Sequence, residues 1–171
     1  MDARSESQPQ KNATTVERKS ERELVVTRTI NGLARVVFEA WTKPELFKRW
    51  WVPKSAGISL LSCEVDARVG GSYRLVFDVG DSKTMAFFGK YLEVTPHSRI
   101  VWTNEESAEQ FVTTVTFTEQ GGKTLVVMSE LYPSKEALDN AVASGSQDGT
   151  RETFEQLEEF IATLGANVGR S

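Results

Sequence analysis

One turn, flanked by two alternating apolar runs, constrains the fold of this chain more than any other feature. The stretch 66–73 reads Asp-Ala-Arg-Val-Gly-Gly-Ser-Tyr. In 59–68 and again in 72–79, apolar residues occupy every second position, which is the period of a half-buried strand. Glycine adopts backbone angles that other residues avoid. Gly70 and Gly71 therefore predict a tight turn between two antiparallel strands.

The charged residues before this turn predict a structural role. Asp66 and Arg68 lie two positions apart, so on a strand they share a face and can form an ion pair. Gly70 and Gly71 do not indicate a phosphate-binding loop, because no helix follows them. We expect all four residues to fix the hairpin.

β-Branched residues predict a strand at 24–30, and four further strands are predicted at 84–95, 98–104, 111–119 and 123–132. Their connections are short, as at Pro96–His97 and Gly121–Gly122, and short turns join antiparallel neighbours.

Helical spacing appears on both sides of this block of strands. A first helix is predicted by the apolar set Ala34, Val37, Phe38 and Trp41. Pro44 can open a second short helix, which Pro53 ends. After the strands, Ser134 is a candidate N-cap of a short helix. A terminal helix, ended by Gly165, is predicted by the stripe Phe154, Leu157, Ile161 and Leu164.

The domain organisation follows from these elements. Residues 1–21 are charged and polar and are expected to form a disordered tail. Residues 22–165 form one domain, and 166–171 form a C-terminal tail. The predicted fold class is α+β: a strongly curved antiparallel sheet of about seven strands wraps around the C-terminal helix, with two short helices after the first strand.

Composition narrows the function classes. The 171 residues are 39% hydrophobic, enough for one domain with a core. The net charge is −4 and no basic block occurs, so we expect no nucleic-acid partner. No apolar run approaches the ~20 residues of a membrane span, so we expect no membrane insertion. The single Cys63 fits a reducing, cytoplasmic compartment, and with one histidine, His97, we expect no metal or cofactor.

The ordered set of motifs resembles a known family. It is similar to the START-like, or birch-pollen-allergen-like, helix-grip superfamily, and within it to the branch named for the activator of the ninety-kilodalton heat-shock chaperone's ATPase. The resemblance covers residues 22–164. Its matching elements are Thr27–Arg28, 37–42, Pro44–Glu45, Trp50–Pro53, 66–73, Gly89–Tyr91 and Gly149. Relatives often carry a tryptophan shortly after that last glycine, whereas this chain has Thr153-Phe154, so we carry over no ligand identity.

The resemblance implies a cavity between the sheet and the terminal helix. Of the adjacent Trp50 and Trp51, one should pack inward and the other lie at a pocket rim. Either an open cavity or a filled core is consistent with the aromatic pattern. The cavity-lining candidates are Trp50, Trp51, Tyr73, Phe77, Phe87, Tyr91, Trp102, Phe111 and Phe154. Glu155 or Glu158 is a candidate for a carboxylate at the pocket mouth.

Three functions stay open. The first is non-enzymatic binding of a small hydrophobic or amphipathic ligand, such as a lipid, by a monomer or homodimer. The second, implied by the resemblance, is a chaperone-associated interaction module active in stress response. The third is a cyclase-like enzyme, which requires a buried carboxylate or tyrosine with a shifted pKa. No catalytic residue is assigned, because no catalytic constellation accompanies the motifs.

Overall fold

The chain folds around one eight-stranded antiparallel sheet. The computed structural model describes residues 14–106 and 110–170. The strand order is β1-β2-β8-β7-β6-β5-β4-β3. The strands are β1 (Thr15–Arg18), β2 (Glu23–Ile30), β3 (Ser59–Val65), β4 (Ser72–Gly80), β5 (Lys83–Thr95), β6 (Arg99–Asn104), β7 (Phe111–Gln120) and β8 (Lys123–Leu131).

The helices lie in two segments of the chain, one between β2 and β3 and one after β8. Between β2 and β3 lie α2 (Ala34–Thr42), α3 (Pro44–Phe47) and the 3-10 turn η2 (Lys54–Ala56). After β8 come α4 (Lys135–Ala143) and the long terminal helix α5 (Ser146–Arg170). As predicted, Pro44 opens α3, and the Ser134 hydroxyl accepts a hydrogen bond from the Ala137 amide at the start of α4. None of these helices, within the described residues, is long and apolar enough to cross a bilayer.

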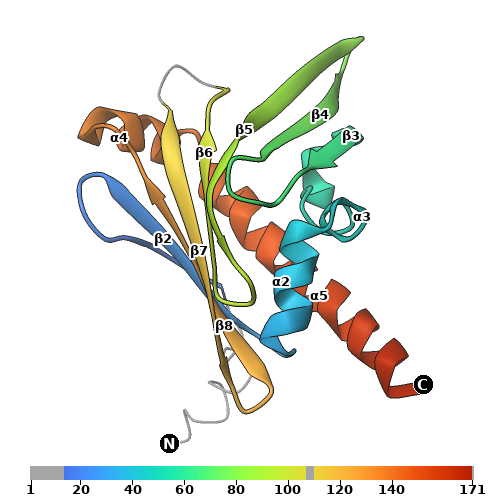
Figure 1. Cartoon of the computed structure of the whole chain (residues 1–171). Helices are drawn as coiled ribbons and strands as arrows, with labels where there is room; N and C mark the ends of the chain where they lie inside the picture. The colour runs from blue at the N-terminus through green and yellow to red at the C-terminus, as the bar shows by residue number, and fades with distance from the viewer. Residues whose placement is uncertain (1–13, 107–109, 171) are drawn as a thin grey trace, which may run out of the picture.

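The curved sheet holds α5 and α2 in its hollow (Figure 1). Phe154 and Leu157 of α5 are 0% exposed, and Ala34, Val37, Phe38 and Trp41 of α2 are buried with them. The core therefore lies between the concave face of the sheet and these two helices, and the predicted α+β helix-grip arrangement is confirmed.

Both ends of the predicted domain need correction. Thr15–Arg18, expected in the disordered tail, form β1 and pair with β2, where Val16 lies opposite Val26. The free edge of β2 offers backbone groups that any extended segment can pair with. Helix α5 continues past Gly165 to Arg170, since one glycine costs only about 1 kcal/mol in a helix and does not end it. The rest of the predicted tails, residues 1–13 and 171, lies outside the described residues.

One strand departs from its alternating pattern. The pairing of β3 with β4 shifts between Leu60 and Ser62, which marks a β-bulge. The bulge breaks the period of two, so Leu61 is 56% exposed while Cys63 and Val65 stay half-buried.

Candidate functional site

Two adjoining spaces open between the concave sheet face and the helices. An inner pocket of about 40 Å³ lies among side chains from α2, α3, β4, β5 and β6. A larger cleft of about 270 Å³ lies beside it, between the sheet and the start of α5. The two spaces share four wall residues, Trp51, Phe87, Trp102 and Asn104. Their common wall makes them one candidate site.

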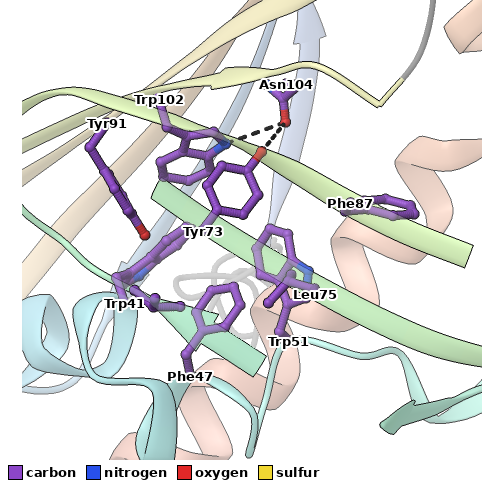
Figure 2. A pocket seen from close by; sticks show the side chains of 10 residues that line it. Trp41, Phe47, Trp51, Tyr73, Leu75, Phe87, Tyr91, Trp102 and Asn104 are labelled. Carbon is purple, nitrogen blue, oxygen red and sulfur yellow. Dashed lines mark hydrogen bonds between the residues drawn. The ribbon is translucent and has the colours of Figure 1, made fainter. Parts of the chain in front are cut away.

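The inner pocket is narrow and mostly aromatic. Its volume suffices for about three water molecules or the end of a small ligand. Tyr73, Tyr91 and Trp102 project into it from neighbouring strands, opposite Trp41 and Phe47 (Figure 2). The strand alternation noted in the sequence brings these rings to one face.

The two adjacent tryptophans diverge, as the sequence predicted. Trp50 is 1% exposed and donates its indole N–H to the carbonyl oxygen of Ala40 at 2.9 Å. Trp51 stacks on Phe47, with ring centroids 4.8 Å apart, and lines both the pocket and the cleft. Trp50 is therefore a core residue, and Trp51 forms part of the site wall.

The glycine turn positions one wall of the pocket. The Gly70 amide donates to the carbonyl oxygen of Tyr91, and the Tyr91 amide donates to the carbonyl oxygen of Gly71. Gly70 has φ +85°, and a Cβ on Gly71 would lie 2.0 Å from the carbonyl oxygen of Asp66, so each position requires glycine for its own reason. The turn thereby fixes the backbone of Tyr91.

The acid and base of the turn form the expected ion pair. Arg68 Nε lies 3.0 Å from both carboxylate oxygens of Asp66. Both side chains are exposed, so the pair contributes about 0–1 kcal/mol.

A hydrogen-bond network built on Asn104 locks two of the rings (Figure 2). Its Oδ1 accepts from the Trp102 indole N–H at 3.3 Å and lies 3.4 Å from the Tyr73 hydroxyl. Its Nδ2 donates to the Phe111 carbonyl oxygen at 3.1 Å and to Thr113 Oγ1 at 2.8 Å. Because every polar atom of this amide is used, Asn104 positions the site wall and offers little to a ligand.

Three of the hydrogen-bond donors on residues that line the inner pocket are the hydroxyls of Tyr73 and Tyr91 and the indole N–H of Trp41. Burial raises the pKa of Tyr73 and of Tyr91 well above the ordinary tyrosine value, so both hydroxyls stay protonated donors. The Tyr73 hydroxyl donates to the carbonyl oxygen of Thr103 at 2.8 Å. Trp41 Nε1 is buried and has no hydrogen-bond partner among the described residues. Trp41 thus lines the pocket with its ring, while its indole nitrogen is covered by neighbouring atoms.

The cleft contains a carboxylic acid that the sequence reading missed. Glu130 lies on β8 and lines the cleft, and the Tyr132 hydroxyl donates to its Oε1 at 3.1 Å. Burial raises the pKa of Glu130 to about 7, against the smaller opposing effect of that hydrogen bond. The sequence offered a signal in the alternate spacing of Val126, Met128 and Glu130. Since Val126 and Met128 are buried in the structure, position 130 on the same face also points inward.

Seven of the nine predicted lining residues lie in the walls. Phe111 and Phe154 line the cleft, and five others line the pocket, namely Trp51, Tyr73, Phe87, Tyr91 and Trp102. Phe77 does not; it is 3% exposed and packs edge-on against Phe87 at 5.3 Å. Phe77 and Trp50 are thus filled core.

The acids expected at the pocket mouth lie elsewhere. Glu155 is exposed, and Glu158 forms an ion pair with Arg28 at 3.1 Å. Burial raises the pKa of Cys63, so its thiol is not activated as a nucleophile. Neither Glu155 nor Glu158 lines the cleft, whereas Glu130 does.

Comparison with known proteins gives the family. Residues 33–162 match the family described as "Activator of Hsp90 ATPase homolog 1-like protein". The chain belongs to this family. No curated protein matches the chain.

Solved structures of bacterial proteins share the helix-grip fold of this family member. A protein from Rhodobacter sphaeroides is 21% identical, with a TM-score of 0.81 over 88% of this chain and 99% of that one. A protein from Nitrosomonas europaea is 24% identical, with a TM-score of 0.78 over 87% and 99%. A protein from Staphylococcus epidermidis is 26% identical, with a TM-score of 0.73 over 88% and 94%. These likenesses support the fold and assign no ligand.

Proposed function

We propose that this domain binds a small amphipathic molecule between the concave sheet face and α5. The observation that carries the proposal is the cleft of about 270 Å³, whose wall includes Trp51, Phe87 and Trp102, three residues that also line the inner pocket. Ligand sites are typically concave, largely apolar and equipped with a few polar groups, with volumes upward of about 300 Å³. The cleft and pocket together fit a ligand at the small end of that range.

The unsatisfied indole of Trp41 supports an occupied interior. A buried donor without a partner costs roughly 1–3 kcal/mol. Trp41 Nε1 has no hydrogen-bond partner among the described residues, and its ring lines the inner pocket. Because this nitrogen is covered by neighbouring atoms, a ligand oxygen could accept its hydrogen bond and recover part of that cost only if those atoms moved aside.

The apolar walls set the scale of affinity. Burying a ring system the size of an aromatic side chain removes about 150–250 Å² from water. At about 25 cal/mol per Å² this amounts to about 4–6 kcal/mol before ordering costs. Without those costs, about 4–6 kcal/mol corresponds to dissociation constants of about 40 μM to 1 mM, so simple ring compounds should bind no more tightly than this.

Fluorescence titration with N-phenyl-1-naphthylamine, a neutral apolar probe, tests the proposal. We expect emission to rise on binding to the wild-type protein. Gly149 lies on α5 in the cleft wall, and a Cβ there would meet only Pro53 Cγ, at the ordinary distance of 3.6 Å. Gly149→Leu should block the cleft, and Gly149→Ala is the matched control that should not. Equal binding by all three proteins, or no binding by any, would refute the proposal.

The buried acid favours a second candidate, a cyclase-like enzyme. Such an enzyme needs a general acid with a pKa near the working pH. Glu130 lines the cleft and burial raises its pKa to about 7. This candidate predicts turnover of a bound carbonyl compound that Glu130→Gln abolishes without weakening its binding. If the compound binds but is not turned over, the cyclase-like candidate is wrong and ligand binding alone stands.

The family description also keeps a chaperone-linked role as a candidate. That role needs a protein-binding outer surface, and the exposed apolar side chains Leu61, Val69 and Leu92 are available for it. A pull-down with the cell's ninety-kilodalton heat-shock chaperone tests this role, and no complex at micromolar concentration would remove it.

A further inference from the structure

The charged side chains that line the cleft are acidic. Its charged wall residues within the described part of the chain are Glu106 and Glu130, and no lysine or arginine there lines it. Glu106 lies just after β6 and accepts a weak hydrogen bond from the Phe88 amide at 3.3 Å. Among the described residues, an anionic head group entering the cleft would therefore meet two carboxylates and no lysine or arginine.

Glu130 is placed to receive a ligand's donor group. It lies opposite Leu24 of β2 and Thr113 of β7 in the sheet, both of them buried. Its Oε1 accepts from the Tyr132 hydroxyl, but its Oε2 has no hydrogen bond among the described residues. No lysine or arginine of that part of the chain lies within ion-pair distance of Glu130. The carboxylate thus keeps one free oxygen in a partly buried, apolar setting.

Aromatic side chains form much of the cleft wall to which this carboxylate belongs. Phe111 stacks on Tyr132 with ring centroids 4.4 Å apart, and Phe154, Trp51 and Trp102 form other parts of the same wall. Aromatic faces attract organic cations, most strongly where water is excluded. A carboxylate beside several aromatic rings is complementary to an ammonium group carried on an apolar body.

Building on the ligand-binding function proposed above, we infer that the cleft selects an amphipathic organic cation, with its ammonium group at Glu130 and its apolar part against Trp51, Phe87 and Trp102. Fatty acids and other anionic amphiphiles are disfavoured by the same arrangement. Neutral analogues of the same shape should bind through the apolar walls alone.

The protonation of Glu130 couples this selectivity to pH. Burial raises its pKa to about 7, so near neutral pH about half of the free protein carries the acid uncharged. A bound cation favours the ionised form, and affinity for it should rise as pH rises through that value. The other titratable groups that the described residues contribute to the cleft wall are Glu106 and the Tyr132 hydroxyl, which donates to Glu130.

Three probes that share one ring system and differ in head group test the inference. They are 2-naphthylmethylamine, 2-naphthylmethanol and 2-naphthoate, measured by isothermal titration calorimetry. At about pH 8 we expect the amine to bind about tenfold more tightly than the alcohol, and the carboxylate to bind most weakly. Glu130→Gln should reduce the amine's affinity to that of the alcohol while leaving the alcohol's affinity unchanged. Glu64→Gln, which changes an exposed acid on β3, is the matched control and should retain the preference.

The wild-type protein gives a second measurement that needs no variant. At about pH 6 the amine's advantage over the alcohol should shrink, because Glu130 is then mostly protonated. If the alcohol binds in the cleft but the amine binds no more tightly at either pH, the inference is wrong and the ligand-binding function stands. If none of the three probes binds, the ligand-binding function itself is wrong.

Discussion

Replacing Glu130 by glutamine should change the stability of the protein in a pH-dependent way. Burial raises the pKa of this carboxyl from its ordinary value of 4.5 to about 7. As pH rises above 4.5, the unfolded chain releases this proton while the folded protein still holds it, so stability falls with pH across that interval. At 1.36 kcal/mol per pH unit, the full loss is about 3 kcal/mol. Glutamine has the same shape and does not ionise.

Urea unfolding of both proteins at several pH values measures this effect. Near pH 4.5 the two should be equally stable, apart from a modest change in the hydrogen bond with Tyr132. At about pH 8, Glu130→Gln should be more stable than wild type by about 3 kcal/mol. Exposed acids with lowered pKa values, such as Asp139 beside Lys135 and Arg18, affect both proteins alike and cancel in the difference. A difference that stays constant with pH would show that Glu130 is not desolvated in the cleft.

Three further substitutions test the packing. Gly89→Ala should lower the free energy of unfolding in urea by several kcal/mol, because the added Cβ would lie 1.9 Å from the Thr103 carbonyl oxygen. A stability near that of the wild type would show that the two backbones are not so close. Phe154→Ala, at a fully buried ring, should cost about 3–5 kcal/mol, and a loss below about 1 kcal/mol would mean that α5 is not seated in the sheet. Ser134→Ala should cost about 1 kcal/mol by removing the cap on the Ala137 amide, whereas Ser134→Asp should largely retain it.

Local patterns predicted most of the fold, because they depend on near neighbours in the chain. The alternating apolar residues in 59–68 and 72–79 located the hairpin of β3 and β4, and Ser134 located the start of α4. The strand β1 was not predicted, because it contains a single apolar residue, Val16. Its pairing with β2 stabilises it, and sequence spacing does not encode that contact. The exposure of Leu61 was not predicted, because a β-bulge interrupts the alternation and no residue type in the sequence signals that bulge.

The candidate site was predicted in its apolar part and missed in its polar part. Alternation brought Tyr73, Tyr91 and Trp102 to one face, as expected. Asn104 and Glu130 were not predicted, because a polar residue on a strand is ordinarily expected to face solvent. Both nevertheless lie on the same face as the buried alternate residues of their strands. Tertiary packing decides which polar residue is enclosed, and α5 supplies that packing from the far end of the chain.

The most direct test of an interior binding site is a titration of ¹⁵N-labelled protein with 2-naphthylmethanol, followed by NMR. The four tryptophans give separate indole signals that report on different places. The signals of Trp51 and Trp102, in the wall shared by pocket and cleft, should shift strongly, and that of Trp50, buried and bonded to Ala40, should shift little. No indole shift, or shifts confined to amides on the outer face around Leu92, would contradict the account.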